Sequence, residues 1–376
     1  MTFLPPGRPA QWSGPLREVD RLEWRSGDPG DPGALLADLL QAHGLAGEPA
    51  SQRGDLAVAL LLGAVGCELL AGLAPGLPTP VPAVPEVVAV VVQGSSRPVV
   101  GAASGGASVG EWTDSWTEAD HAAAVERVRA TIARGEVYQA NVVGHRSAPY
   151  AGDPLALARA VAALPRATYG GVLAGQGWTV GCASPEQLLR VMGDRVTTVP
   201  IKGTGRDAAA LHASDKDRAE HVMIVDLERN DLARVAQTGS VVVEQLYDVA
   251  PWSDLFHASS RVAATLRPGV GLLELLRALA PGGSVTGAPK RAACRVVAEV
   301  EAVGRGPAMG ALGFVWPGGV DLGLTIRTVA LDADRVHLWA GGGITWGSDA
   351  SSEVAEARAK ADPVLRAIAQ VRPSAS

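Results

Sequence analysis

The sequence predicts a globular protein in which helices and strands are mixed, without the regular strand-helix alternation of a parallel sheet. Two observations carry this prediction. The 376 residues are 47% hydrophobic and 19% charged, a composition that supports a large core in one big domain or in two smaller ones. Segments with strand patterns and segments with helix patterns also follow one another in irregular order, and no tandem repeat divides them.

The first 115 residues are rich in Pro and Gly and contain the earliest predicted elements. A helical pattern covers residues 33–43, apolar runs cover 56–73, and a strand pattern covers 87–92. Residues 101–110 include two adjacent glycines and predict a surface loop. We expect a domain boundary at the end of this loop, near residue 115.

The next segments predict a capped helix and two strands. Thr117 is an N-cap residue for a helix over 118–133. Residues 135–143 predict a turn followed by a strand. A second strand is predicted over 195–199, where β-branched residues alternate with others, and Pro200 breaks it.

Lys202 lies where this second strand is expected to meet a turn, between Pro200 and Gly203. Side chains at such positions are held rigidly and often carry function. A nucleophilic lysine must lose its proton, which at the ordinary lysine pKa of ~10.4 costs roughly 4–5 kcal/mol at pH 7. Burial or a nearby cation lowers that cost. The alternative is a solvated surface lysine, which is the usual state of this residue type.

Two predicted helices each carry a pair of acids three residues apart, and residues at this spacing share one helix face. Asp217 and Glu220 lie in the first helix. Glu353 and Glu356 lie in the second, with Lys360 one turn later. Carboxylates from two helices can hold Mg²⁺ and leave positions for water or a substrate oxygen. Alternatively, these acids complement the helix dipole or pair with basic residues at the surface.

Two further segments have the features of anion-binding sites. Residues 281–290 precede a predicted helix over 291–300, where backbone amides and the Thr286 hydroxyl suit an anion or a polar substrate group. A glycine run follows a predicted strand over 336–340 and exposes backbone amides with no side chain in the way; it consists of Gly341, Gly342 and Gly343. A tight turn is the alternative for this run.

Arg327 is a charge within an otherwise apolar predicted strand over residues 324–329. Such a charge needs a partner, and a carboxylate from a ligand or from the protein itself fits the guanidinium group. His257 is a second polar candidate in an apolar setting. It is either a proton carrier or a core histidine whose hydrogen bonds are satisfied.

The charge pattern and the cysteines limit the partners and the cellular compartment that we expect for the protein. The 33 Lys and Arg are scattered among 39 Asp and Glu, so no nucleic-acid or membrane partner is expected. Cys67, Cys182 and Cys294 have no metal-ligand or redox spacing, which favours free thiols in a reducing cytoplasm. The N-terminus lacks a signal-peptide pattern, and no apolar run reaches the ~18–20 residues that span a bilayer.

Ordered motifs between Thr117 and Ile368 resemble those of the chorismate-utilising enzymes. This family includes the large subunits of anthranilate synthase and aminodeoxychorismate synthase, and the isochorismate and salicylate synthases. The matching segments are 136–141, Ser184-Pro185-Glu186, Pro200-Ile201-Lys202-Gly203-Thr204, 217–221 with 226 and 229–231, 283–290, Ile326-Arg327-Thr328, 340–343 and 353–360. The number of motifs and their common order carry the resemblance.

The resemblance implies an α+β fold with two large antiparallel sheets packed face to face, helices outside them and the active site in a cleft between the sheets. Residues 1–115 would form an abbreviated N-terminal part of this fold, and residues 116–376 the chorismate-binding catalytic region. The chain has no Leu-Leu-Glu-Ser segment like that of tryptophan-regulated relatives. Feedback by tryptophan is therefore not expected.

Two positions separate the subfamilies. Isochorismate and salicylate synthases carry a water-activating lysine where this chain has Gln139, so direct hydration of the ring is not expected. Anthranilate synthases usually carry alanine, and aminodeoxychorismate synthases lysine, where this chain has Lys202. The chain therefore looks like aminodeoxychorismate synthase component I, which serves p-aminobenzoate and folate synthesis. The alternatives are anthranilate synthase component I, an aminodeoxyisochorismate-type synthase, and a non-catalytic relative that binds a dicarboxylate.

The resemblance also implies a mechanism and a set of site residues. Neutral Lys202 attacks C2 of chorismate, Glu186 protonates the leaving C4 hydroxyl, and ammonia then adds at C4 and expels the lysine. The implied Mg²⁺ ligands are mainly Glu220 and Glu356, with Glu353 and Asp217 nearby. The enolpyruvyl carboxylate is assigned to Arg327, Gly341, Gly342 and Gly343. The remaining substrate contacts are Gln139, Thr204, His257, Thr286 and Lys360.

Ammonia must come from another protein, since the chain has no Gly-x-Cys-x-Gly nucleophile elbow of a glutaminase. By family analogy the source is a glutamine amidotransferase subunit. The chain also departs from the family at Ala308, in the segment Arg305-Gly306-Pro307-Ala308, because relatives carry a tyrosine at this position. We therefore expect one substrate contact to be missing or replaced.

Overall fold

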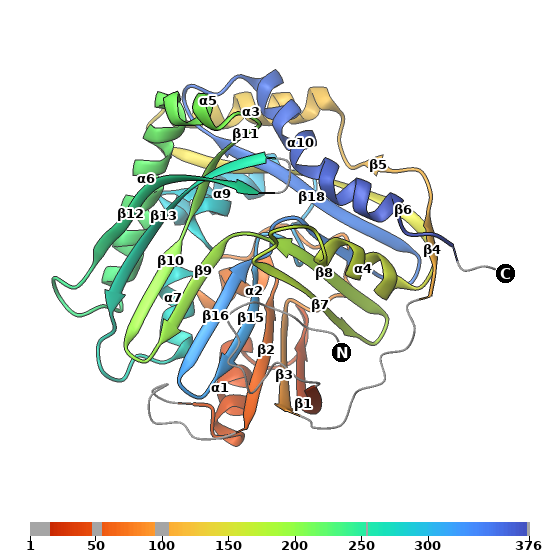
Figure 1. Ribbon diagram of the computed structural model, residues 1–376, viewed down its shortest axis with the longest axis vertical. Coiled ribbons are helices and arrows are strands. Elements are labelled where there is room, and N and C mark those ends of the chain that lie inside the picture. The colour runs from red at the N-terminus through yellow and green to blue at the C-terminus, as the bar shows by residue number, and fades with distance from the viewer. Residues whose placement is uncertain (1–15, 47–54, 95–104, 253–254, 374–376) are drawn as a thin grey trace.

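The computed structural model describes residues 16–46, 55–94, 105–252 and 255–373. These residues form ten helices and eighteen strands, and the strands make two sheets (Figure 1). Throughout the described ranges, paired strands run antiparallel. The predicted α+β fold with two antiparallel sheets is confirmed.

The larger sheet has ten strands and the smaller sheet has eight. The larger sheet follows the order β1 (Leu16–Trp24), β3 (Val87–Gly94), β2 (Leu56–Leu62), β15 (Ala311–Trp316), β16 (Gly319–Leu324), β9 (Gln187–Met192), β10 (Arg195–Val199), β13 (Leu255–Thr265) and β11 (Ile201–Gly205), with β12 (Val242–Trp252) paired to β13. The smaller sheet follows the order β14 (Gly287–Ala288), β6 (Gln139–Gly152), β18 (Arg335–Ile344), β17 (Thr328–Leu331), β8 (Trp178–Ser184) and β7 (Tyr169–Gly175), with β4 (Ala107–Val109) and β5 (Thr113–Asp114) paired to β6.

The helices cover the outer faces and the ends of the sheets (Figure 1). They are α1 (Pro32–Ala42), α2 (Ala64–Leu70), α3 (Glu118–Ala133), α4 (Pro154–Ala162), α5 (Ala208–Ala213), α6 (Asp215–Ala233), α7 (Leu272–Leu279), α8 (Gly283–Thr286), α9 (Lys290–Val300) and α10 (Ala350–Ala369). Helix α4 packs on β7 and β8, α10 packs on β18, and α6 packs on β13. Two of these helices, α6 and α10, carry the predicted acidic pairs.

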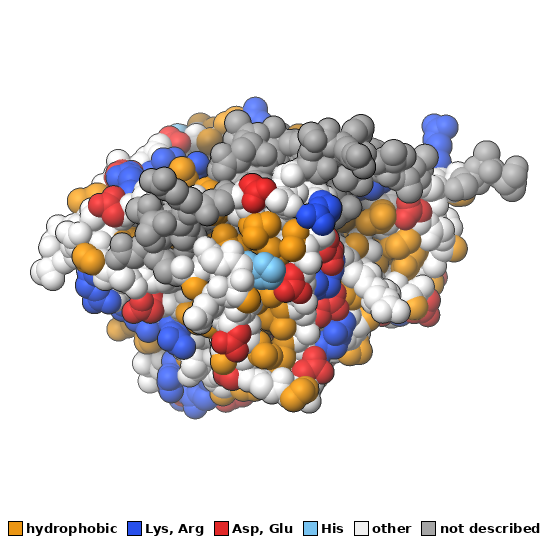
Figure 2. All heavy atoms as spheres, turned by 90° about the horizontal axis from the view of Figure 1, so that it is seen from below, with side chains coloured by type: hydrophobic (Ala, Val, Ile, Leu, Met, Phe, Trp, Pro, Cys, Tyr) orange, Lys and Arg blue, Asp and Glu red, His pale blue; other side chains and the backbone are white. Residues whose placement is uncertain are grey.

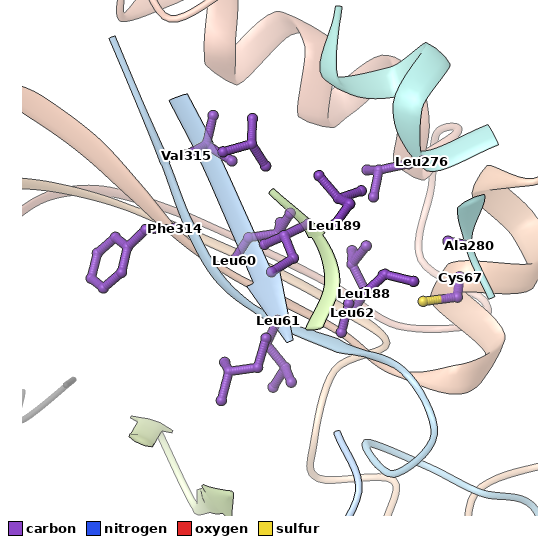
Figure 3. Packing of buried hydrophobic residues seen from close by; sticks show 14 of the residues in the cluster. Leu60, Leu61, Leu62, Cys67, Leu188, Leu189, Leu276, Ala280, Phe314 and Val315 are labelled. Atoms are coloured by element: carbon purple, nitrogen blue, oxygen red, sulfur yellow. The ribbon is translucent and has the colours of Figure 1, made fainter. Parts of the chain in front are cut away.

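The main hydrophobic core is built around strands β2 and β3, which are continuous apolar runs buried on both faces. Leu60 and Leu62 lie on the side of β2 that packs against α2 and α7, and Leu61 points to the opposite side (Figure 3). Trp178 and Val180 of the smaller sheet belong to the same buried cluster. The two sheets therefore share one core, as alternating side chains of the central strands require.

Several local predictions are confirmed. The predicted helix over 118–133 is α3, and Thr117 caps it by accepting a hydrogen bond from the amide of Asp120 at 3.2 Å. The patterns over 33–43, 87–92 and 195–199 correspond to α1, β3 and β10. These elements carry their own signals, because caps and alternation depend only on neighbouring residues.

The predicted loop over residues 101–110 is only partly within the described chain. Its first four residues lie outside the described ranges, and Ala107–Val109 form β4, which pairs with β6. Strands that precede residue 115 enter both sheets, since β1 to β3 belong to the larger one and β4 and β5 to the smaller one. A domain division near residue 115 stays a prediction.

One face of the molecule shows both positive and negative side chains on its surface. Figure 2 shows the lower face of the molecule, on which Lys and Arg are interspersed with Asp and Glu and hydrophobic side chains gather near the centre. Among the helices of the described residues, none combines the length and the hydropathy that a membrane crossing requires. The three cysteines are buried and free of disulfide bonds.

Candidate active site

A cavity of about 270 Å³ opens where the two sheets and three helices meet. Strands β11 and β13 of the larger sheet, strands β6 and β18 of the smaller sheet, and helices α6, α8 and α10 contribute to its wall; most of these elements converge in the upper half of Figure 1. Its lining residues are Asn141, Pro185, Glu186, Ile201, Lys202, Gly203, Asp217, Glu220, His257, Ser284, Val285, Met309, Ile326, Arg327, Trp339, Ala340, Gly341, Gly343, Glu353, Glu356 and Lys360.

The cavity gathers most of the residues that the sequence singled out. Eleven of the fifteen predicted site residues line it, although they lie on elements far apart in the chain. The four others are Gln139, Thr204, Thr286 and Gly342. This convergence makes the cavity the candidate active site.

Lys202 lies within a short strand of its own, not at the turn that the sequence predicted. It pairs with Ala258 in β13, and a bulge follows at Gly203, whose φ is +80°. The Lys202 Nζ donates a hydrogen bond to the backbone oxygen of Ser284 at 2.8 Å. Burial lowers the pKa of this amine, although the nearby carboxylates of Glu220 and Glu186 oppose the shift. The cavity therefore favours a neutral, nucleophilic amine more than water does.

Glu186 lies next to this amine, in the connection between β8 and β9. Its side chain is buried, and its Oε1 accepts a hydrogen bond from the amide of Ile201 at 3.1 Å. Burial raises the pKa of Glu186, since a charged carboxylate is poorly solvated there. In this site the Glu186 carboxyl group holds its proton more tightly than it would in water. The neighbouring Lys202 amine holds its proton less tightly than it would in water.

The predicted acidic pairs enter the cavity from two helices. Asp217 and Glu220 come from α6, and Glu220 Oε1 accepts a hydrogen bond from Thr345 Oγ1 at 3.2 Å. Glu353 and Glu356 come from α10, where Lys360 Nζ lies 2.6 Å from Glu356 Oε1. All four acids line the same cavity, and Glu356 also forms the ion pair with Lys360 that the alternative predicted.

The four carboxylates fit a divalent cation by their chemistry. In the described ranges, no three His, Cys, Asp or Glu side chains are gathered tightly enough to enclose a metal ion. Mg²⁺ does not need such a cage, since it retains several waters and commonly takes one or two carboxylates together with substrate oxygens. Hard oxygen donors from α6 and α10 around an open cavity meet this requirement.

The glycine run is part of a strand and not a turn. Gly341, Gly342 and Gly343 belong to β18 and pair with Val143, Val142 and Asn141 of β6. Pairing between β18 and β17 ends at Leu338, so the other edge of the run faces the cavity. Lys360 Nζ donates to the Gly341 oxygen at 3.1 Å. The run therefore lets a strand pass close to α10 and Lys202 without side chains between them.

Close contacts explain why glycine is required in this run. A Cβ at Gly341 would lie 1.9 Å from the backbone oxygen of Val142, and one at Gly343 would lie 1.9 Å from Gln139 Nε2 and 3.0 Å from Lys202 Nζ. Gln139 is completely buried, and neither of its amide atoms has a hydrogen-bond partner among the described residues. The Gln139 amide is therefore an unpaired buried polar group beside the Lys202 amine, behind the residues that line the cavity.

These contacts predict different costs for two similar substitutions. Gly341→Ala meets backbone that cannot move, so we expect it to lower the free energy of unfolding by about 3 kcal/mol or more. Gly343→Ala meets the ends of two side chains, and we expect a loss of about 1 kcal/mol. Urea unfolding of both variants measures the difference. Equal midpoints for the two would contradict the geometry.

Arg327 lies between β16 and β17, not within a strand as predicted. Its φ is +52°, a left-handed conformation that is costly for a non-glycine residue and common at functional sites. Its Nη2 lies 2.9 Å from His257 Nε2. Burial, with the Arg327 charge as a second cause, lowers the pKa of His257 to about 3, so the imidazole is neutral at neutral pH and accepts from the guanidinium. His257 therefore orients Arg327 toward the cavity.

Comparison with known protein families shows which family shares this sequence. The family described as chorismate binding enzyme matches residues 86–366, three quarters of the chain. The chain belongs to the chorismate-binding enzyme family. The family resemblance predicted from the sequence motifs is thereby confirmed.

Curated relatives within the chorismate-binding enzymes carry two different names. Anthranilate synthase component 1 of Streptomyces coelicolor is 37% identical over 75% of this chain and 57% of that protein. Aminodeoxychorismate synthase component 1 of Salmonella typhimurium is 34% identical over 68% of this chain and 58% of that protein. The chain thus spans little more than half the length of these relatives.

Solved structures of chorismate-binding enzymes share the fold. Anthranilate synthase component I from Streptococcus pneumoniae TIGR4 matches with a TM-score of 0.80 and 24% identity, over 94% of this chain and 92% of that one. A putative 2,3-dihydroxybenzoate-specific isochorismate synthase from Bacillus anthracis matches with a TM-score of 0.71 and 22% identity, over 93% of this chain and 91% of that one. At these identities the likeness establishes the fold alone.

Three described residues of the predicted set do not line the cavity of this chorismate-binding enzyme, namely Gln139, Thr286 and Gly342. Thr286 does not line it, and its hydroxyl donates to the Gly282 oxygen at 2.8 Å within the short helix α8. Lys290, the first residue of α9, pairs through its Nζ with Asp231 at 2.7 Å. The side chain of Thr204 lies outside the described residues.

Ten described residues of the cavity wall were not among the predicted site residues, and three of them are Ser284, Asn141 and Met309. Ser284 supplies the backbone oxygen that accepts a hydrogen bond from the Lys202 amine, and its side chain interacts with Glu186. Asn141 and Met309 also line the cavity. Ser284 and Asn141 stand in the matching motifs, so motif membership was the available signal. Ala308, which replaces the family tyrosine, is buried in the main core beside Met309.

Proposed function

We propose that this chorismate-binding enzyme is an aminodeoxychorismate synthase component I, which converts chorismate and ammonia to 4-amino-4-deoxychorismate. The observation that carries the proposal is Lys202, whose amine faces the cavity in a setting that lowers its pKa. Lysine at this position distinguishes the aminodeoxychorismate synthases from the anthranilate synthases, as described above. The product would feed p-aminobenzoate and folate synthesis.

The proposed chemistry consists of two displacements. Neutral Lys202 Nζ attacks C2 of chorismate, the ring double bond shifts, and the C4 hydroxyl leaves as water with a proton from Glu186. Ammonia then adds at C4, the double bond shifts back, and the lysine leaves C2. Two displacements retain the configuration at C4. Glu186 suits the acid role because its raised pKa keeps more of it protonated near neutrality.

Other residues of the cavity bind and orient the substrate in this proposal. Arg327, held by His257, and the open edge of the glycine run receive the enolpyruvyl carboxylate. Glu220 and Glu356, with Glu353 and Asp217 nearby, would hold Mg²⁺. Bound Mg²⁺ would bind the ring carboxylate and draw electron density from C2.

The metal assignment predicts a change in Mg²⁺ dependence. Glu220→Gln and Glu356→Gln each replace a charged oxygen donor by a neutral amide, and we expect the Mg²⁺ concentration for half-maximal activity to rise about tenfold or more. Glu126→Gln, on the exposed face of α3, is the matched control. Calorimetric Mg²⁺ titration of the same variants gives a readout without turnover. An unchanged titration would count against these ligands.

Ammonia is expected from a glutamine amidotransferase subunit. The names of the relatives, component 1, support a second component, and no glutaminase motif occurs in the chain. Free ammonium should replace this partner in vitro. We further propose that residues 116–376 form the catalytic region and that residues 1–115 support it.

Anthranilate synthase component I is the second candidate. The identity to the Streptomyces coelicolor protein favours it, since that identity is slightly higher than to the aminodeoxychorismate synthase. An aminodeoxyisochorismate-type synthase would use the same cavity. A non-catalytic dicarboxylate-binding relative is disfavoured, because binding alone does not require a buried lysine beside a buried glutamic acid.

Product identification distinguishes these candidates. The purified protein is incubated with chorismate, Mg²⁺ and ammonium, and the product is identified by mass spectrometry and by coupling to a lyase that forms p-aminobenzoate. We expect 4-amino-4-deoxychorismate. Anthranilate as the main product would overturn the assignment in favour of the second candidate.

A further inference from the structure

A buried ion pair lies directly behind the cavity and outside the proposed catalytic set. Glu301 ends helix α9, and Arg305 follows it four residues later; both side chains are almost fully buried. Arg305 Nη2 lies 2.7 Å from Glu301 Oε1, and Arg305 Nε lies 3.0 Å from Glu301 Oε2. The pair has the bidentate geometry that fixes the plane of a guanidinium group.

The remaining donors of this guanidinium bind two parts of the cavity wall. Arg305 Nη1 donates to the Val285 oxygen at 2.6 Å, and Nη2 donates to the Asn141 oxygen at 2.6 Å. Glu301 Oε1 in turn accepts from the amide of Val143 at 2.8 Å. The ion pair therefore ties α8 to strand β6, and both Val285 and Asn141 line the cavity.

Both attachments lead to Lys202. On the α8 side, Ser284 precedes Val285, and the backbone oxygen of Ser284 accepts a hydrogen bond from the Lys202 amine at 2.8 Å. On the β6 side, Asn141 pairs with Gly343, and a Cβ there would lie 3.0 Å from Lys202 Nζ. The amine thus sits between two backbone segments that one guanidinium group joins at this level, while the pairing of β14 with β6 joins them on the far side of α8.

We infer that Arg305, oriented by Glu301, is a positioning residue that fixes the Lys202 amine in the cavity by holding α8 and β6 at their spacing. Arginine suits this role because its planar guanidinium group donates hydrogen bonds in several fixed directions at once. The ammonium group of a lysine is a single point on a flexible side chain and does not reproduce these directions. The catalytic consequence rests on the proposed function, because it assumes that Lys202 is the nucleophile. The mechanical coupling does not depend on that assumption.

Arg305→Lys tests the coupling while it keeps a cation beside Glu301. The first readout is the rate at which formaldehyde and cyanoborohydride methylate Lys202, measured by peptide mass spectrometry relative to Lys360 in the same cavity. We expect this ratio to change roughly threefold or more, and kcat for amination to fall about 10–100-fold with KM for chorismate within about twofold. Tyr169→Phe is the matched control, because it removes a buried hydrogen bond to Asp321 without touching the cavity wall.

A double variant keeps the test decisive if Arg305→Lys does not fold. Arg305→Met with Glu301→Met removes both charges together, which buried ion pairs often tolerate. A folded variant of either kind with unchanged Lys202 labelling and unchanged kcat would overturn the inference. If the wild-type protein makes no 4-amino-4-deoxychorismate but the labelling ratio still shifts in the variants, the proposed function fails and the positioning role stands.

Discussion

Lys202→Ala is expected to lower kcat/KM for 4-amino-4-deoxychorismate formation by about 10³-fold or more, because the variant lacks the group that forms the covalent intermediate. Chorismate binding in the presence of Mg²⁺ should stay largely intact, since Arg327, the glycine run and the four acids remain. Product formation with ammonium and calorimetric titration with chorismate measure the two effects separately.

Lys202→Arg is the control that separates charge from nucleophilicity. Arginine keeps a positive charge and donors near the Ser284 oxygen, but it does not provide a neutral amine because its pKa exceeds ~12. The arginine variant should therefore be as inactive as the alanine variant. Undiminished amination by either variant would refute covalent catalysis by Lys202.

Glu186→Gln is expected to lower kcat by about 10²- to 10⁴-fold, the usual contribution of a general acid. The amide keeps the shape of the protonated carboxyl group and has no proton to give to the leaving hydroxyl. In the wild-type protein, kcat/KM should fall as rising pH ionises Glu186. A wild-type pH profile without this alkaline limb, or a fully active glutamine variant, would assign the acid to another group.

Stability supplies a second readout for Glu186. Burial raises its pKa in the folded protein, so the protonated form is favoured on folding and the protein loses stability as the carboxyl ionises. Glutamine is neutral at every pH. The free energy of unfolding of Glu186→Gln relative to wild type should therefore increase as the pH rises above the ordinary pKa of a glutamic acid, because the unfolded chain ionises there while the folded carboxyl still holds its proton. A difference that stays constant as the pH rises would show that the carboxyl is not perturbed.

The elements that the sequence predicted well are those whose signals are local. The Thr117 cap and the apolar spacing after it define α3, and acids three residues apart on α6 and α10 share a face wherever those helices pack. Local rules of capping and helical spacing are enough for such elements. The resemblance to a family added the arrangement of the two sheets, which no local pattern contains.

The errors fall where strand pairing is decided by distant residues. Gly341 to Gly343 continue β18 because β6, almost 200 residues earlier in the chain, pairs with them to Ile344. Lys202 lies in a strand because β13 pairs with it at Ala258. Arg327 is not in a strand and has a φ of +52°, a conformation that its apolar neighbours in the sequence do not predict. The sequence contains no separate signal for these long-range contacts.

The most direct test of the account is detection of the adduct on Lys202. Wild-type protein is mixed with chorismate and Mg²⁺ without ammonia, quenched rapidly, digested and analysed by peptide mass spectrometry. Covalent catalysis by Lys202 predicts that the peptide with Lys202 gains the mass of chorismate less one water, and that ammonium discharges this adduct as 4-amino-4-deoxychorismate. An unmodified Lys202 peptide in a protein that turns chorismate and ammonium into anthranilate would contradict it.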